Sequence, residues 1–395
     1  MRHLDKPTKN VAIVYPYFAH YRLPVIRVLI KSPQFHYTLI SDPISGNDIK
    51  KISPDLAIRD TKDGGLDWKF VKNRWIYKEA LLWQSGLLKL LREKKYDAVI
   101  FLGNAYYLST WLSIFYLKLK GEKTYMWTHG VISKKKGWKW TLRKVFYGLS
   151  DGVLLYGHKA KEVMIENGFP ERKLHVIYNS TGTVDDLIKK NEVSIQSKNK
   201  TKKQLFKHPD LPVIIFVGRL TFVKKLDQIL QATKVLFDDN FKINVLFVGD
   251  GEARKDLENL AKTLGLSDYC HFYGACFEER ELEKLFAISN LCVSPGEVGL
   301  TAMSALGNGI PVLSHDDFNY QMPEYEAIEA GVNGLLFKRN SIPDLALKIN
   351  QWIVENRDMP EELIAQNCKK IIKEKYNAEY QAELINKILS KDLLV

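Results

Sequence analysis

The chain has 395 residues, of which 46% are hydrophobic and 26% charged, and its formal net charge is +12. This composition excludes a disordered chain, and the length suits two domains of ordinary size better than a single hydrophobic core. The four cysteines lack the spacing of metal ligands, and no apolar run reaches about 18 residues, the length that a membrane-spanning helix needs. We therefore expect a cytoplasmic protein without disulfide bonds or a structural metal.

The positive charge is concentrated in the first half of the chain. Residues 1–180 contain 31 Lys and Arg against 15 Asp and Glu, whereas residues 181–395 contain 27 against 31. A basic half favours an anionic partner, such as a nucleic acid, an anionic membrane or a phosphate-bearing substrate. A basic surface that only promotes solubility is the alternative, and charge alone does not separate the two.

In chain order, the first half alternates short apolar runs with helical patterns. The run Val11–Tyr17 contains Pro16 and is not followed by a small-residue cleavage site, so we interpret it as a first strand and not as a signal peptide. Further strands are expected at His36–Ile40, Ala98–Leu102, Lys123–Trp127 and Gly152–Tyr156. Helices are expected at Tyr21–Leu29, Tyr77–Arg92 and Tyr106–Leu119.

A polar, lysine-rich segment at residues 189–210 reads as a linker or a surface excursion. The alternation then restarts, with strands expected at Val213–Val217, Lys242–Val248, His271–Tyr273, Leu291–Val293 and Pro311–Leu313. Helices are expected at Lys225–Phe237, at residues 253–264 and at Tyr380–Leu389. The pattern predicts an α/β fold of two doubly wound, Rossmann-like domains, whose ligands bind at the carboxyl ends of the strands. Two such domains can face each other across a cleft.

The first glycine turn follows a strand and reads Phe216-Val-Gly-Arg-Leu220. Gly218 permits close approach of the backbone to a ligand, and Arg219 and Lys224 can converge on one diphosphate. A second turn, Phe247-Val-Gly-Asp-Gly251, lacks the full G-x-G-x-x-G fingerprint, so a nicotinamide cofactor is not indicated. Taken alone, each turn is also compatible with an ordinary connection between a strand and a helix.

The longest motif runs from Ser294 to Val312 and reads SPGEVGLTAMSALGNGIPV. Glu297 and Gly299 fall in its turn, and a helix is expected to begin at Leu300. The N-terminus of that helix offers free N–H groups to an anion, and a carboxylate in the turn can accept hydrogen bonds from sugar hydroxyls. Packing alone does not explain so many coordinated glycines and prolines.

Together, these motifs resemble the family-4 glycosyltransferases of the GT-B architecture. The resemblance covers Val213 to Phe337 well, including Pro323-Glu324, and extends more weakly through the first half. It implies two facing Rossmann-like domains that transfer a sugar from a UDP- or GDP-linked donor to an acceptor hydroxyl. The residues that it assigns to the donor diphosphate are Arg219, Lys224, Lys225, Gly299 and Leu300. Those that it assigns to the nucleotide and ribose are Gly218, Gly249, Gly251 and Ser304.

This chain departs from the family's pattern at two kinds of position. Lys225 stands where the family usually has glycine, so either neighbouring lysine can reach the phosphate. The paired glutamates of the family's E-x7-E motif fall on Gly296 and Ser304. Glu297, one position along, can replace the first glutamate, whereas a serine can make only one hydrogen bond to the ribose. The chain therefore looks like a subgroup with a degenerate motif.

In the first half, Trp127-Thr-His-Gly130 ends a strand. The family commonly has a histidine here that contacts the donor sugar or its phosphate, so His129 and Glu297 are the expected catalytic residues. A lone histidine is also compatible with a structural role. The acceptor-side loop of the family corresponds to the end of the first strand, which assigns the acceptor to His20, Tyr21 and Arg22.

The resemblance further implies a retaining, metal-independent enzyme without a cofactor. The departing diphosphate would itself help to deprotonate the acceptor hydroxyl in front-face transfer. Arg219, Lys224 and the helix N-terminus at Leu300 would stabilise the negative charge that develops on it.

Residues 130–149 combine lysines and arginines with Trp138, Trp140 and Phe146. This mixture suits a membrane interface, and residues 134–146 are the expected contact with an anionic membrane. Stacking on single-stranded nucleic acid and a solvated helix with its aromatic residues in the core are the alternatives, and nucleic acid is the less favoured partner. The resemblance implies a glycan or lipid-linked glycan acceptor in surface polysaccharide assembly.

The expected domains are an acceptor-binding domain at residues 1–182 and a nucleotide-sugar-binding domain at residues 183–375. A final helix at residues 376–395 is expected to pack back on the first domain. Two other functions on the same fold stay open, a sugar-nucleotide epimerase and a non-catalytic protein that binds a nucleotide sugar or a polyanion.

Overall fold

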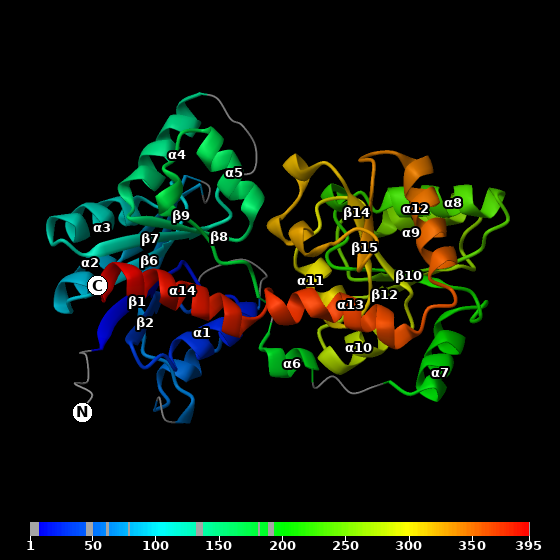
Figure 1. The fold of residues 1–395 in the computed structure, drawn as a ribbon, viewed down its shortest axis with the longest axis horizontal. Coiled ribbons are helices and arrows are strands. Elements are labelled where there is room, and N and C mark those ends of the chain that lie inside the picture. The colour runs from blue at the N-terminus through cyan, green and yellow to red at the C-terminus, as the bar shows by residue number, and fades with distance from the viewer. Residues whose placement is uncertain are drawn as a thin grey trace. The chain divides into compact units, whose positions relative to one another are not determined.

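The computed structural model describes residues 8–44, 50–60, 63–77, 80–131, 137–180, 182–188 and 193–394 (Figure 1). The chain forms two compact units. Unit 1 comprises Met1–Thr183 and Asn377–Val395, and unit 2 comprises Val184–Tyr376.

Unit 1 is built on a sheet of seven parallel strands. Their order is β3 (Trp68–Phe70), β2 (Phe35–Ser41), β1 (Lys9–Val14), β6 (Ala98–Leu102), β7 (Lys123–Thr128), β8 (Gly152–Leu155) and β9 (Leu174–Val176). Alternate residues of β1 enter two different cores, with Val11 and Ile13 in one and Ala12 and Val14 in the other. Both faces of the sheet are therefore buried, which explains the continuous apolar runs of its central strands.

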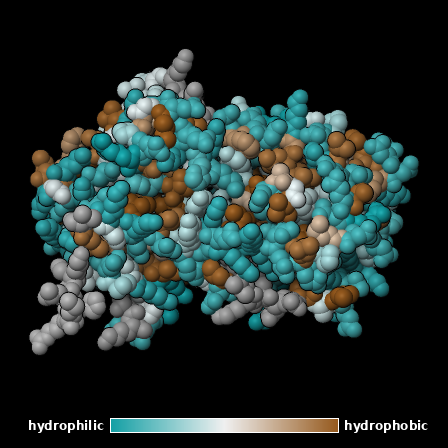
Figure 2. Space-filling model, in the orientation of Figure 1, coloured by the Kyte–Doolittle hydropathy of each residue, from teal (hydrophilic) through white to brown (hydrophobic). Residues whose placement is uncertain are grey.

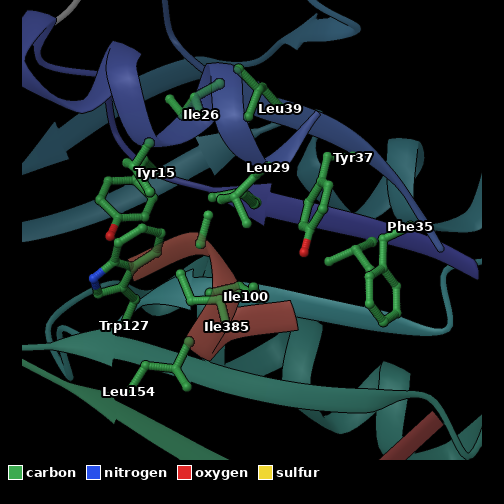
Figure 3. Packing of buried hydrophobic residues seen from close by; sticks show 14 of the residues in the cluster. Tyr15, Ile26, Leu29, Phe35, Tyr37, Leu39, Ile100, Trp127, Leu154 and Ile385 are labelled. Carbon is green, nitrogen blue, oxygen red and sulfur yellow. The ribbon is translucent and has the colours of Figure 1, made fainter. Parts of the chain in front are cut away.

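Helices cover both faces of this sheet. In chain order they are η1 (His20–Arg22), α1 (Leu23–Leu29), η2 (Pro54–Ala57), α2 (Leu87–Glu93), α3 (Leu108–Leu119), α4 (Trp138–Leu149), α5 (His158–Glu166), η4 (Glu171–Lys173) and α14 (Ala378–Leu393). The last helix, drawn red in Figure 1, packs along α1. Its Asn386 accepts a 2.6 Å hydrogen bond from Tyr37, and Ile385 enters the core shown in Figure 3.

An antiparallel hairpin replaces the first half of a predicted helix in unit 1. Strands β4 (Lys72–Ile76) and β5 (Leu81–Ser85) pair where part of a helix was expected at Tyr77–Arg92. Leu82 is buried in this pairing, and the buried amide of Gln84 donates to the carbonyl of Tyr15 across 2.9 Å. These tertiary contacts outweigh the helical spacing of the apolar residues, and the helix begins only after Gly86, at φ 95°.

Unit 2 contains six parallel strands. Their order is β12 (Cys270–Gly274), β11 (Asn244–Val248), β10 (Val213–Val217), β13 (Leu291–Ser294), β14 (Val312–His315) and β15 (Gly334–Phe337). The helices are α6 (Val184–Ile188), α7 (Ile195–Leu205), η5 (Phe222–Lys224), α8 (Asp227–Asp238), α9 (Arg254–Thr263), α10 (Glu279–Ala287), α11 (Leu300–Gly307), η6 (Phe318–Tyr320), η7 (Pro323–Ala327), α12 (Ile342–Glu355) and α13 (Glu361–Glu374). The strand order is that of a doubly wound Rossmann-like sheet, and it reverses between β10 and β13. Nowhere in the described residues does a helix combine the length and apolarity needed to cross a membrane.

The segment predicted as a linker contains a helix. Helix α7 begins after Ser194, whose hydroxyl accepts a hydrogen bond from the N–H of Ser197, and it buries none of its residues. Because the helix is polar on all sides, it leaves no apolar periodicity in the sequence.

Candidate functional site

Three loops meet at the carboxyl ends of β10, β11 and β13 in unit 2. The N–H of Leu220 donates to the carbonyl of Asp250 across 2.9 Å, which joins the loops after β10 and β11. The N–H of Gly296 donates to the carbonyl of Lys224 across 3.0 Å, which joins the loop after β13 to η5. These loops flank the point where the strand order reverses, the usual ligand site of a doubly wound sheet.

Glycines make this convergence possible. A Cβ atom on Gly249 would lie 1.8 Å from the carbonyl oxygen of Gly218, and one on Gly251 would lie 2.5 Å from that of Leu220. A Cβ atom on Gly296 would lie 2.3 Å from the carbonyl oxygen of Val223. No larger residue fits at these positions unless the loops separate.

Lys224 links the loop after β10 to the loop after β13. Its Nζ donates to the backbone carbonyl of Glu297 across 2.8 Å and lies 3.6 Å from Oε1 of the same residue. Burial lowers the pKa of Lys224, and the carboxylates of Glu297 and Glu324 counteract this shift. The two residues that the sequence assigned to the diphosphate and to catalysis are thus in direct contact.

Lys225 is directed elsewhere. Its ammonium donates to the side-chain oxygen of Asn340, in the loop after β15. The residue adopts φ 50°, the left-handed conformation that glycine supports most easily, which explains why a glycine suits this position. Of the two neighbouring lysines, only Lys224 lies against the loop of Glu297.

Arg219 is exposed beside Lys224, and its positive charge contributes to lowering the pKa of that lysine. Within the residues that the structure describes, no hydrogen bond or ion pair holds its guanidinium. The five N–H donors of Arg219 can therefore bind an oxyanion, and no contact inside the described part of the protein has to break first.

Helix α11 begins at this point with Leu300, and Gly299 occupies its N-cap position. Among the described residues no side chain caps the first turn, so its backbone N–H groups can serve an anion. The hydroxyl of Thr301 donates to the carbonyl of Val217 across 2.8 Å and ties the helix to the end of β10.

Ser304 lies one helical turn after Leu300 and is half-buried. In the described part of the chain its hydroxyl has no hydrogen-bond partner, although its backbone carbonyl accepts from Asn308. The side chain is therefore free to bind a hydroxyl of a ligand at the same end of the helix.

Two buried residues of this region were not predicted as site residues. The side-chain oxygen of Gln321 accepts a 2.8 Å hydrogen bond from the N–H of Val298, and its amide donates to Ser314 and to the carbonyl of His315. This residue fixes the loop that carries Glu297. Glu324, which is 2% exposed, contributes a negative charge near Lys224. Their only signal in the sequence is the Gln321-Met-Pro-Glu324 segment, which follows a strand.

In unit 1, His129 follows β7 and packs against Tyr156, with the ring centroids 4.7 Å apart. His129 is exposed, but the surrounding protein still removes much of the hydration of its ring. This desolvation, together with the charge of Arg22, lowers the pKa of His129 to about 4. The ring is therefore neutral at physiological pH and can donate one hydrogen bond and accept another.

The three residues assigned to the acceptor form η1, directly after the turn that follows β1. The N–H of His20 donates to the carbonyl of Lys50 across 2.8 Å, and this contact positions the turn. His20 is exposed, Tyr21 is half-buried, and Arg22 is buried at 7% exposure. Arg22 donates a hydrogen bond to the hydroxyl of Tyr156, the residue that contacts His129. The structure thus brings Arg22 and His129 together in unit 1.

No group of three or more His, Cys, Asp or Glu side chains in the described ranges is arranged to hold a metal ion. The residues assigned to the donor all lie in unit 2, and those assigned to the acceptor lie in unit 1 together with His129.

Two family models match the chain. The model described as "Glycosyl transferases group 1" matches residues 197–370, and the model described as "Glycosyltransferase Family 4" matches residues 64–183. The first spans the three loops of unit 2, and the second spans β6, β7 and His129 of unit 1.

Curated relatives match over part of their length. An uncharacterized glycosyltransferase of Methanocaldococcus jannaschii is 28% identical over 53% of this chain and 51% of its own length. The lipopolysaccharide 1,6-galactosyltransferase of Escherichia coli is 25% identical over 67% of this chain and 68% of its own length. For the putative glycosyltransferase EpsD of Bacillus subtilis, which is 24% identical, the match covers 40% of each chain. The chain thus matches about half or less of the length of some of these relatives.

Solved structures share the whole fold. HepE of Anabaena in complex with UDP has a TM-score of 0.71 at 17% identity, over 97% of this chain and 100% of its own. A glycosyltransferase of Rickettsia africae has a TM-score of 0.73 at 14% identity, over 98% of this chain and 99% of its own. At these identities the likeness establishes the fold, which is GT-B.

Proposed function

Because models of the group 1 and family 4 glycosyltransferases match residues 197–370 and 64–183 and the chain has the GT-B fold, we propose that it transfers a sugar from a nucleotide-sugar donor to an acceptor hydroxyl. The observation that carries this proposal is the convergence of three glycine-bearing loops in unit 2 around Lys224, Arg219 and the N-terminus of α11. Cations and free N–H groups gathered at the carboxyl ends of parallel strands suit a diphosphate.

The donor is a UDP- or GDP-linked sugar in this proposal. UDP and UDP-glucose occur in the solved structures of HepE, which supports a uridine donor for a chain of the same fold. Ser304 would make a single hydrogen bond to the ribose, where a carboxylate could bind two hydroxyls. The affinity for the nucleotide would then depend more on contacts with its diphosphate than on contacts with its ribose.

Transfer proceeds with retention and without a metal in this proposal. The leaving diphosphate accumulates negative charge, which Arg219, Lys224 and the first turn of α11 stabilise. As it departs, the diphosphate takes the proton of the attacking acceptor hydroxyl on the same face of the sugar. Glu297 holds sugar hydroxyls, and His129 stays neutral and acts as a hydrogen-bonding group.

Hydrolysis of the donor in the absence of an acceptor tests this proposal. The protein is incubated with UDP-glucose, UDP-galactose and GDP-mannose, and NMR identifies the anomer of the free sugar that forms first. We expect slow release of the nucleoside diphosphate from one donor and an α sugar from that α-linked donor. The Arg219→Ala variant should lose this activity, whereas Arg357→Ala, at an exposed position of unit 2, should retain it.

The other outcomes contradict parts of this proposal. A β sugar as the first product contradicts retention. An epimerised nucleotide sugar identifies an epimerase, and binding of the donor without any turnover of it identifies a non-catalytic binding protein.

We further propose that the acceptor is a glycan or lipid-linked glycan in the assembly of a surface polysaccharide, at the inner face of the cytoplasmic membrane. The lipopolysaccharide galactosyltransferase among the relatives supports this setting. In α4, Trp138 is 70% exposed and lies under the ammonium of Lys139, whereas Phe146 is buried and Trp140 packs on Phe169. Lys134, Lys135 and Lys136 lie outside the described residues.

The neighbouring helix α3 extends this surface. Its Trp111 packs on Phe146 of α4, and its outer face exposes an apolar stripe at helical spacing: Leu108, Leu112, Phe115 and Leu119. Hydrophobic residues are visible in Figure 2 along the edge of unit 1 on this side. Lys118 and Lys120 lie next to this stripe in the sequence. Apolar side chains combined with lysines favour an anionic lipid surface as the partner over a second basic copy of the chain.

Sedimentation with vesicles tests this contact. We expect binding to phosphatidylglycerol vesicles, no binding to phosphatidylcholine vesicles, and loss of binding in a Leu112→Glu, Phe115→Glu double variant. The control is Leu347→Glu, at an exposed apolar position in unit 2. Equal binding of all variants would exclude α3 as the contact.

A further inference from the structure

Unit 1 buries a guanidinium, and no carboxylate of the described residues lies beside it. Arg22 is 7% exposed, and within the described part of the chain its side chain donates one hydrogen bond, to the hydroxyl of Tyr156. Among the residues that the structure places, none supplies an acidic group within ion-pair distance of it. A buried charge without a counter-ion is costly, so folded proteins rarely retain one that has no function.

Aromatic rings enclose this guanidinium. Its central carbon lies 4.8 Å from the ring centroid of Trp127, 5.3 Å from that of Tyr15, and 5.5 Å from those of Tyr21 and Tyr156. Rings attract a cation through their faces but accept few of its N–H groups. Since a guanidinium carries five N–H donors, most donors of Arg22 still require an acceptor.

Two more buried donors are close to Arg22. Among the described residues, no acceptor meets hydrogen-bond geometry with the hydroxyl of Tyr15 or the indole N–H of Trp127, although the Tyr156 side chain interacts with that hydroxyl. The two residues are 4% and 1% exposed. Figure 3 shows their oxygen and nitrogen near each other, on the same side of the two packed rings. Burial raises the pKa of Tyr15, so its hydroxyl stays protonated and can donate.

We propose that Arg22, Tyr15 and Trp127 form an anion-binding subsite that holds a phosphate or carboxylate group of the acceptor. Tyr15 follows β1, Arg22 belongs to η1 and Trp127 lies in β7, and each of the three brings at least one N–H or O–H donor. A sugar hydroxyl needs acceptors as well as donors, and a water molecule would satisfy N–H groups without balancing the charge. An oxyanion does both. The site itself depends only on unit 1, whereas its assignment to the acceptor rests on the proposed transferase function.

Inorganic phosphate serves as the probe for this subsite. The indole N–H signal of Trp127, identified by its absence in Trp127→Phe, is followed by NMR during a phosphate titration at constant ionic strength. We expect saturable shifts in the wild type, at least about tenfold weaker binding in Arg22→Met, and unchanged binding in Arg27→Met, an exposed arginine of α1. Tyr15→Phe removes only a hydroxyl and should weaken binding about 2- to 10-fold without altering the fold.

A second phosphate titration, in the presence of saturating UDP, shows whether phosphate and UDP compete for the same site. Unchanged phosphate binding assigns the subsite to the acceptor, whereas displacement of phosphate by UDP overturns that assignment in favour of the donor diphosphate. Absence of saturable binding, or equal loss in Arg22→Met and Arg27→Met, overturns the subsite. Failure of UDP to bind unit 2 would contradict the proposed function and leave the phosphate titration unaffected.

Discussion

The ammonium of Lys224 and the backbone carbonyl of Glu297 are joined by a 2.8 Å hydrogen bond between the loops after β10 and β13. The contact holds a cation at the point where the strand order of unit 2 reverses. The carboxylate of the same residue lies 3.6 Å from the ammonium, so a bound diphosphate would compete with Glu297 for this cation.

Lys224 and Lys225 are expected to respond differently to substitution. Lys224→Ala should weaken binding of UDP or GDP about 10- to 100-fold, since it removes a charged hydrogen bond to the diphosphate. Lys225→Ala should change the affinity less than about twofold, because its ammonium is held by Asn340. Isothermal titration calorimetry of both variants checks this, and an equal loss in the two would contradict the assignment.

Gly296 is expected to be required for the shape of the site. Gly296→Ala should cost about 1–3 kcal/mol of the free energy of unfolding and remove nucleotide binding, because the new methyl group meets the carbonyl of Val223. Gly265→Ala is the matched control. Gly265 has a positive φ and an open surrounding, so its variant should lose about 1 kcal/mol and keep nucleotide binding. Thermal unfolding and calorimetry together separate the two effects.

Ser304 is expected to contact the ribose. Ser304→Ala should weaken binding of the nucleoside diphosphate about 2- to 10-fold and leave the unfolding temperature unchanged, because the hydroxyl has no partner in the described part of the protein. Deoxyribose nucleotides provide the control. We compare the 2′-deoxy and the 3′-deoxy nucleoside diphosphate. One of them lacks the hydroxyl that Ser304 contacts, and this one should bind with equal affinity to the wild type and to Ser304→Ala.

His129 is expected to stay neutral over the working range of pH. An NMR titration of its ring should give a pKa near 4, and Arg22→Met should move this value upward by removing a nearby positive charge. The pKa of His129 is lower in the folded protein than in the unfolded chain. Between about pH 6.5 and about pH 4, the histidine is therefore protonated in the unfolded chain but neutral in the folded protein, and unfolding is coupled to proton uptake. His129 should therefore reduce stability over that interval, and His129→Asn should lessen the loss. A pKa of His129 near the usual value for histidine would contradict the effect of burial and of Arg22 on this ring.

Much of the fold could be predicted from the sequence, because buried parallel strands leave unbroken apolar runs. Ala98–Leu102 and Val213–Val217 coincide with β6 and β10. The prediction of two Rossmann-like domains with the GT-B fold is confirmed. The glycine turns also indicated which strand ends carry the candidate donor site.

Other features depend on contacts that a local pattern does not encode. The β4–β5 hairpin is stabilised by pairing across the chain, and α7 is a helix without an apolar face. Gln321 reaches the loop of Glu297 from another strand end. Likewise, nothing in the sequence showed that Arg22 would be buried among rings from β1, β7 and β8.

Calorimetric titration of the wild type and of Arg219→Ala with UDP, GDP and ADP tests the donor site most directly. We predict micromolar binding of one of these nucleotides by the wild type and about 10- to 100-fold weaker binding by Arg219→Ala, with both proteins folded. Absence of binding to all three nucleotides by the folded wild type, or equal binding by the variant, would contradict the donor site in unit 2.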